Sequence, residues 1–359
     1  MDYIKASLDV ERSDFHLNLE LSIFKGEITG LYGPSGSGKS SLLRLIAGVK
    51  SQSPQDRVDI STNEEIWSSA DHFIQTHLRS IAYVFQEAQL FPHLNVRGNL
   101  EYAIQRKRNK TDVDLNQVKQ WLNIDGLLNK STDDLSGGEK QRVCIARALL
   151  SGAQAMLMDE PLGALDHRAR YRILPYIDQI HKRLDFPFLY VSHAIDELTY
   201  LTDKIHVMDK GRITESGSTL IMGPKLGIDS LDASAIITCD VDHYNEKYQL
   251  TCLNFESQKI YIAGNKSMGE SLKLNIPARD VSIAKSLPQD SSILNILKGS
   301  VVAIHESKEG SSELVQVQVG NQTILSRITR LSIDKLNIEI GLAVYVQIKS
   351  VSLISEYGN

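Results

Sequence analysis

The stretch "LYGPSGSGKSSLLRLIAG", residues 31–48, decides the fold of the first part of the chain. Four glycines and one lysine interrupt an otherwise apolar run, and apolar residues at helical spacing follow from residue 42. Residues 33–40, "GPSGSGKS", fit the pattern G-x-x-x-x-G-K-[ST]. A buried strand that ends in such a loop and continues as a helix predicts a site for nucleotide phosphates.

Binding of phosphate groups would account for the glycines, the lysine and the serine of this loop. Gly36 and Gly38 permit backbone angles that a Cβ atom forbids, so that successive N–H groups turn inward around an anion. The helix that follows points its positive end at the same place. Lys39 offers a mobile cation to the β and γ phosphates, and the Ser40 hydroxyl offers a ligand to Mg²⁺. The predicted nucleotide-binding residues of the loop are Gly33, Pro34, Ser35, Gly36, Ser37, Gly38, Lys39, Ser40 and Ser41.

A second stretch of sequence also indicates nucleotide chemistry. "AMLMDE", residues 155–160, reads as a buried strand that ends in two acids. Asp159 at such a strand end can hold the Mg²⁺ shell through water, and Glu160 can orient an attacking water. Solvated acids at a strand end are common, but paired with the loop they predict nucleotide hydrolysis.

Strand and helix patterns alternate through the first part of the chain and favour an α/β fold with a mainly parallel sheet. Short β-like runs dominate from about residue 235 and predict an all-β, OB-like appendage. We therefore expect a nucleotide-binding domain over 1–230, with a helical part at about 87–150, and an all-β region over 231–359. A small module is expected within that region at about 289–355.

Composition excludes several classes. The net charge of −5 gives no reason to expect a nucleic-acid partner. Cys144, Cys239 and Cys252 have the spacing of no metal motif and suit a reducing compartment, and the last two read as small core residues. We expect neither a signal peptide nor a membrane span.

Four further motifs carry a resemblance to the ATPases of ABC transporters over residues 1 to about 235. "LSGGEKQR" (135–142) resembles their signature, "VFQEAQLFP" with Gln86 their Q-loop, "GALD" (163–166) their D-loop, and "YVSHAIDEL" with His193 their switch histidine. The order of the motifs also agrees. The resemblance implies an ABC-type P-loop fold that binds ATP with Mg²⁺ and hydrolyses the ATP.

Residue roles follow from this resemblance. It implies that Glu160 is the general base or water-positioning carboxylate, and that His193 contacts the γ-phosphate. Gln86 is expected near Mg²⁺ and the attacking water, and Asp166 at a dimer interface. Phe15 is the nearest candidate for stacking on the adenine, with Tyr3 behind it; packing in edge strands is the alternative for Phe15.

The signature has a physical basis of its own. Ser136, Gly137 and Gly138 stand at a helix start, where free N–H groups and a hydroxyl can bind a γ-phosphate. The resemblance implies that this phosphate belongs to ATP held by a second copy of the chain, in a head-to-tail homodimer with C₂ symmetry.

The resemblance also implies partners. Without a membrane span, the ATPase needs integral-membrane permease subunits, which would place it peripherally on the cytoplasmic face of the inner membrane. The segment "FPHLNVRGNL" after the Q-loop resembles importers fed by a periplasmic or surface binding protein.

The prediction of the transported substrate comes from the C-terminal part of the sequence. Residues 278–302 resemble molybdate-transporter ATPases, in which such a stretch precedes a molybdate-binding-like module. Ser292, Asn295 and Lys298 could offer donors to molybdate or tungstate, but Leu294 stands where related modules often carry Arg. A dimerising and regulatory tail is the alternative.

Three other functions stay open. The first is an importer of sulfate, iron or sugar. The second is a soluble ABC protein of DNA repair or translation, although such proteins usually have two fused ATPase halves. The third is an oxyanion-binding or storage protein whose active part is the β-rich tail, against which the pair Asp159–Glu160 and the signature argue.

Overall fold

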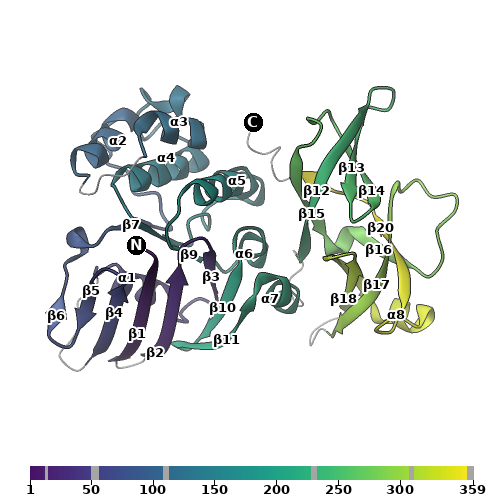
Figure 1. Cartoon of the computed structure of the whole chain (residues 1–359), viewed down its shortest axis with the longest axis horizontal. Coiled ribbons are helices and arrows are strands. Elements are labelled where there is room, and N and C mark those ends of the chain that lie inside the picture. The colour runs from purple at the N-terminus through teal and green to yellow at the C-terminus, as the bar shows by residue number, and fades with distance from the viewer. Residues whose placement is uncertain (13–14, 50–55, 108–112, 228–232, 307–310, 354–359) are drawn as a thin grey trace. The chain divides into compact units, whose positions relative to one another are not determined.

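The computed structural model describes residues 1–12, 15–49, 56–107, 113–227, 233–306 and 311–353 (Figure 1). The chain divides into two compact units, the first from Met1 to Thr219 and the second from Leu220 onward. The expected boundary at residue 230 lies further along the chain than this division. Helix α7 (Thr219–Leu226) lies at the division, and most of its length belongs to the second unit.

A six-stranded sheet forms the centre of the first unit, with the order β11-β10-β3-β9-β8-β7 within the described residues. All neighbours in it are parallel except β10 and β11. The carboxyl ends of β3, β8 and β9 therefore meet at one edge, which is where α/β proteins bind ligands. The strands are β3 (Ile28–Tyr32), β7 (Ile81–Val84), β8 (Ala155–Asp159), β9 (Phe188–Val191), β10 (Lys204–Asp209) and β11 (Arg212–Ser218).

An antiparallel sheet of order β2-β1-β4-β5-β6 lies in the same unit within the described residues. Its strands are β1 (Tyr3–Arg12), β2 (Phe15–Phe24), β4 (Arg57–Thr62), β5 (Ile66–Ser69) and β6 (His72–Phe73). Burial alternates along β2, and its inward side chains Leu17, Leu19, Leu21 and Ile23 pack in one hydrophobic cluster with α1 and the central strands. This sheet therefore buries one face against the nucleotide-binding half.

Helices connect the parallel strands. Between β7 and β8 the chain forms a helical part that contains α2, α3 and α4 (Figure 1). Among the described residues, no helix has both the length and the apolar character needed to cross a lipid bilayer. The helices of this unit are α1 (Lys39–Ile46), α2 (Val96–Gln105), α3 (Leu115–Leu122), α4 (Gly137–Leu150), α5 (His167–Arg183) and α6 (Ile195–Leu201).

The second unit is built from two five-stranded antiparallel sheets within the described residues. The first has the order β14-β13-β12-β15-β21, and the second has the order β16-β20-β17-β18-β19. Inward side chains of both sheets form one hydrophobic cluster, which includes Phe255, Leu274, Val317 and Val346. The predicted fold class, a P-loop α/β domain followed by an all-β OB-like region, is confirmed.

The described strands of the second unit range from 2 residues in β21 to 12 residues in β12. The elements of this unit are β12 (Ser234–Asn245), β13 (Leu250–Phe255), β14 (Gln258–Ala263), β15 (Ser271–Pro277), β16 (Val281–Ala284), β17 (Asn295–His305), β18 (Ser312–Val319), β19 (Gln322–Thr329), α8 (Arg330–Leu336), β20 (Ala343–Ile348) and β21 (Ser352–Leu353).

Candidate functional site

The phosphate loop joins the end of β3 to the start of α1. Gly36 and Gly38 have φ angles of 80° and 105°, in the region that side chains disfavour. A Cβ atom at Gly38 would collide with the ring of Phe15, and one at Gly33 would collide with the carbonyl of Met208. Only glycine fits at these two positions, and the loop keeps its shape because of them.

Lys39 extends along this loop. Its side chain is only 5% exposed, and its Nζ donates to the carbonyls of Gly33 and Pro34 at 2.8 and 2.9 Å. The Glu160 carboxylate lies 3.8 Å from the same nitrogen. Burial lowers the pKa of the Lys39 ammonium, and the charges of Glu160 and Asp159 oppose that shift. The amine is therefore held within the loop by groups that an anionic phosphate can replace.

Asp159 connects the two halves of the predicted Mg²⁺ site. Its Oδ1 accepts a hydrogen bond from Ser40 Oγ at 2.9 Å, and its Oδ2 accepts one from Tyr83 OH at 2.8 Å. Burial raises the pKa of Tyr83, and the neighbouring Asp159 adds to the shift. The phenol therefore stays a neutral donor that fixes the carboxylate. One hydroxyl and one carboxylate oxygen side by side are hard ligands that suit Mg²⁺.

Glu160 has a left-handed backbone with φ of 46°, which costs a non-glycine residue about 1 kcal/mol. Its N–H donates to Val191 O at 3.0 Å, so the strained turn is anchored to the neighbouring strand β9. Its Oε2 lies 3.0 Å from Nδ1 of His193, which follows the end of β9. The two predicted catalytic side chains therefore meet across the edge of the sheet.

A cavity of about 340 Å³ collects most of these groups. Its lining combines backbone of the phosphate loop, hydroxyls, one cation, one amide and one carboxylate. The lining residues are Phe15, Ser35, Gly36, Gly38, Lys39, Ser40, Ser41, Gln86 and Glu160. Gly33, Pro34 and Ser37 instead support the loop, since Ser37 N donates to Pro34 O and Ser37 O accepts from Gly211 N.

The signature residues do not line this cavity. Ser136 caps α4: its Oγ accepts from Glu139 N at 3.3 Å, and its N–H donates to Glu139 Oε2 at 2.8 Å. The hydrogen bond from the Ser136 N–H is the main cause of the lowered pKa of Glu139. Gly137 and Gly138 form the first turn of this helix. Within the described residues of one chain, the phosphate loop and the signature therefore do not form a single binding site.

Asp166 caps the next helix, α5, and its Oδ1 accepts from Ala169 N at 2.9 Å. Beside it, Arg170 Nε donates to Leu165 O at 2.9 Å, and Arg170 Nη1 lies 3.5 Å from Glu197 Oε1. The D-loop is therefore connected to α6 through one arginine.

Glu197 is a buried acid that the sequence reasoning missed. It is 1% exposed, and its Oε2 accepts from Tyr190 OH and Ser192 Oγ, each at 2.8 Å. Burial raises its pKa. Since Ser192 precedes His193, this carboxylate supports the backbone that carries the switch histidine. The only sequence signal was an acid in the short helix "AIDELTYL", where acids are ordinarily solvated.

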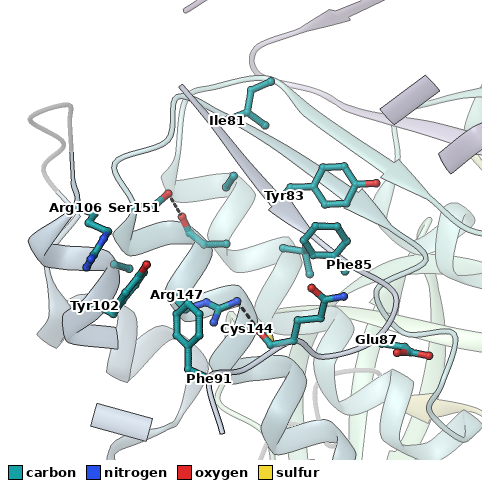
Figure 2. Close-up of a pocket in the computed structure, with 15 residues that line it drawn as sticks. Ile81, Tyr83, Phe85, Glu87, Phe91, Tyr102, Arg106, Cys144, Arg147 and Ser151 are labelled. Atoms are coloured by element: carbon teal, nitrogen blue, oxygen red, sulfur yellow. Dashed lines mark hydrogen bonds between the residues drawn. The ribbon is translucent and has the colours of Figure 1, made fainter. Parts of the chain in front are cut away.

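A second cavity, of about 310 Å³, lies beside the Q-loop between β7, α2 and α4 (Figure 2). Aromatic rings stand at its wall, with the centroids of Phe91 and Tyr102 4.5 Å apart. The Arg106 guanidinium lies 3.7 Å from the Tyr102 centroid, and that of Arg147 lies 4.9 Å from the Phe91 centroid. Burial raises the pKa of the Cys144 thiol in this cavity to about 11. The hollow is an aromatic and cationic surface adjoining the nucleotide site.

Asn295, one of the oxyanion donors predicted in the tail, pairs with backbone groups of a neighbouring strand. Asn295 Oδ1 accepts from Tyr261 N at 2.7 Å, and its Nδ2 donates to Tyr261 O at 3.0 Å. Gln258 makes the same pair of bonds with the backbone of Lys298, at 2.8 and 2.9 Å. These amides join β14 to β17. Asn295 is thus a strand-pairing residue, while Leu294 and Ser292 are exposed.

Comparison with known proteins agrees with this architecture. The ABC transporter family profile matches residues 17–163, and the TOBE domain profile matches residues 291–354. The chain is 40% identical over 360 residues to the molybdenum import ATP-binding protein ModC 1 of Azotobacter vinelandii, covering 98% of this chain and 99% of that protein. It is 39% identical over 358 residues to the molybdenum import ATP-binding protein ModC of Hahella chejuensis, with 98% and 99% covered. The solved structure of cbiO1 from Clostridium perfringens, part of the ABC transporter complex cbiONQ, matches with a TM-score of 0.53 and 27% identity, over 62% of this chain and 91% of that chain.

Proposed function

The chain belongs to the family of ATP-binding subunits of molybdenum-import ABC transporters, and on that premise we propose that it hydrolyses ATP to drive uptake of molybdate or tungstate. The observation that carries the proposal is the cavity in which Lys39, Ser40, Gln86 and Glu160 converge. Its backbone and lysine suit a triphosphate, and its acid suits water activation. Phe15, on the wall of the same cavity, is the residue we assign to the adenine.

Ser40 and Asp159 are the residues that would hold Mg²⁺, with Gln86 as a further oxygen ligand and Asp159 acting through water. These residues suit Mg²⁺ because the Ser40 hydroxyl and the Asp159 carboxylate, both oxygen ligands, already lie 2.9 Å apart. When bound, Mg²⁺ neutralises charge on the phosphates during transfer. The phenol of Tyr83 keeps the Asp159 carboxylate aimed at this position.

Glu160 orients the attacking water and accepts its proton in the proposed mechanism. His193, 3.0 Å from the carboxylate, restrains its rotamer and reaches toward the γ-phosphate. Glu197 and Ser192 hold the segment that carries His193. Lys39 moves from its carbonyl partners to the phosphates, which are stronger acceptors for a cation.

A second copy of the chain completes each site in our proposal. The signature helix tip with Ser136, Gly137 and Gly138 is built to bind an anion yet does not line its own chain's cavity. A head-to-tail homodimer places this tip, together with Asp166, on the partner's ATP. Hydrolysis removes the γ-phosphate that joins the two copies and weakens the interface.

The cavity beside the Q-loop is the surface we assign to the permease. Phe91, Tyr102 and Arg147 offer the aromatic and arginine anchors that interfaces favour. Gln86 stands between Phe85 and Glu87 of this surface and lines the nucleotide cavity, so docking there can reach the nucleotide site. Such a complex holds the chain peripherally at the cytoplasmic face of the inner membrane and receives oxyanion from a binding protein outside. We assign the β-rich tail to dimerisation and regulation rather than transport.

ATPase activity of the reconstituted transporter tests the substrate assignment. Binding protein loaded with molybdate or tungstate should stimulate hydrolysis, whereas binding protein incubated with sulfate should not. Stimulation by sulfate alone would favour the sulfate importer and contradict the proposal. The Glu160→Gln subunit is the control for hydrolysis by contaminating enzymes.

A further inference from the structure

Three metal-ligating side chains meet in the second unit, whereas the nucleotide cavity belongs to the first. Asp242 and His243 on β12 and Cys252 on β13 each offer one ligand atom, and these three atoms all lie within 4.8 Å of one another. Asp242 Oδ2 and His243 Nδ1 are 3.0 Å apart. The carboxylate, imidazole and thiol form a mixed set of metal ligands. None of these three residues has a role in the proposed hydrolysis of ATP.

A β-bulge brings the three side chains to one face. His243 is the cross-strand partner of Cys252, and the register between β12 and β13 shifts between Val241 and His243. In a regular strand, neighbouring side chains point to opposite faces, but the extra residue of a bulge turns Asp242 to the side of His243. Val241 keeps its place in the hydrophobic cluster of this unit. The bulge therefore aims two ligands at the thiol across the strand.

Cys252 differs from the other cysteine of the same sheet. Both thiols are about 2% exposed, but Cys239 belongs to the hydrophobic cluster of the unit and Cys252 does not. Cys252 is the cross-strand partner of Tyr261 on β14 and of His243 on β12, so its neighbours on both adjacent strands carry polar groups. Both cysteines are buried, as the sequence predicts, but Cys252 also lies close to the ligand atoms of Asp242 and His243.

Lys259 occupies the position that a cation would take beside these groups. Its Nζ lies 2.8 Å from Asp242 Oδ2, and it also donates to Asn254 Oδ1. The side chain is 46% exposed, so its ammonium can move into water at little cost. The cluster is thus neutralised by a replaceable monovalent cation.

We propose that Asp242, His243 and Cys252 bind a divalent cation of the zinc class, which displaces Lys259. Zn²⁺ takes sulfur at about 2.3 Å and nitrogen or oxygen at about 2.0–2.2 Å, so tetrahedral ligands lie roughly 3.5 Å apart. Rotamer shifts of about 1 Å bring the three atoms to that spacing. Water fills the fourth position, and the thiol releases its proton to solvent as the metal–sulfur bond forms. The thiolate selects against Mg²⁺ and Ca²⁺, which prefer oxygen.

Titration of the full chain with Co²⁺ tests the site, because a cobalt–thiolate bond gives a charge-transfer band in the near ultraviolet. One equivalent should produce this band, and Zn²⁺ should abolish it. The band should be lost in Cys252→Ser and retained in Cys239→Ser, which changes a buried thiol of the same sheet. A band that survives Cys252→Ser, or no band in the unaltered chain, would overturn the proposal.

Two exposed positions extend the test if Cys252→Ser fails to fold. His243→Gln should weaken Co²⁺ binding at least tenfold, since it removes one of three ligands. Lys259→Gln should tighten binding about five- to tenfold, because the substitution removes both a competitor for Asp242 and a like charge. Weaker or unchanged binding in Lys259→Gln would show that the ion sits elsewhere.

Discussion

Nδ1 of His193 lies 3.0 Å from Oε2 of Glu160, so two side chains just beyond the ends of the adjacent parallel strands β8 and β9 contact each other. This contact restrains a carboxylate whose backbone is itself in a left-handed conformation. The restraint is of the kind that catalytic groups need, because misplacement by about 1 Å can cost a hundredfold in rate.

Replacing Glu160 by Gln should reduce ATP turnover by about 10²- to 10³-fold, because the amide cannot accept a proton from water. ATP binding should remain, so the variant should accumulate as an ATP-bound dimer. Steady-state phosphate release and size-exclusion chromatography with ATP measure the two effects. Glu20→Gln, at an exposed position of β2, is the matched control. Unchanged turnover in Glu160→Gln would remove this residue from its role.

Replacing Glu197 by Ala should destabilise the first unit by about 2–4 kcal/mol, because the hydroxyls of Tyr190 and Ser192 lose their acceptor and Arg170 loses its ion pair. Turnover should also fall, since the segment carrying His193 loosens. Thermal unfolding and ATPase assays measure both. A stable variant with lowered activity would contradict the supporting role.

The stability cost of Glu197→Ala should depend on pH. The folded-state pKa of Glu197 is raised above its unfolded value, so the folded chain binds more protons than the unfolded chain in the window just above pH 4.5. Stability contributed by this group is therefore full below that window and falls as pH rises through it. The difference in unfolding free energy between the two proteins should shrink from pH 4.5 toward neutrality. A difference that grows with pH would contradict the raised pKa.

Replacing Asn295 by Ala should destabilise the second unit by about 2 kcal/mol, because the N–H and C=O of Tyr261 lose their partners. Denaturant unfolding followed by Tyr fluorescence measures this cost. Leu294→Ala, at a side chain that is 62% exposed, should cost less than about 0.5 kcal/mol. Equal costs at the two positions would show that the amide pairing is not stabilising.

Replacing Tyr102 by Ala should weaken binding to the permease by about tenfold or more, because aromatic anchors dominate interface energies. The retained fraction of subunit on immobilised permease measures the loss. Tyr248→Ala, which truncates an exposed ring of the second unit, is the control and should bind normally. Normal binding by Tyr102→Ala would move the docking surface away from this cavity.

The sequence predicted the phosphate loop and the acidic strand end well, because glycine positions and apolar strand ends are local signals. It also predicted which strands carry Glu160 and His193, and the parallel sheet brings those strands together. The boundary was expected between residues 220 and 235, where the sequence is rich in turn residues, and the second compact unit begins at Leu220.

Other features could not be predicted, because they depend on tertiary contacts. Tyr83 reaches Asp159 across 76 residues of sequence, and Asn295 pairs with Tyr261 across 34. Strands β4 and β5 were missed as well, since polar residues interrupt their patterns. Burial of Glu197 follows from packing of α6 against β3 and α5 rather than from its own segment.

Disulfide crosslinking between two differently marked chains tests the shared site most directly. Ser35→Cys marks the exposed phosphate loop of one chain and Ser136→Cys the exposed signature of the other, while the native cysteines are buried. In a hydrolysis-deficient Glu160→Gln background with saturating ATP, we predict a crosslink between the two chains that disappears without nucleotide. A complete lack of ATP-dependent crosslinking, with both chains remaining monomeric, would contradict the account.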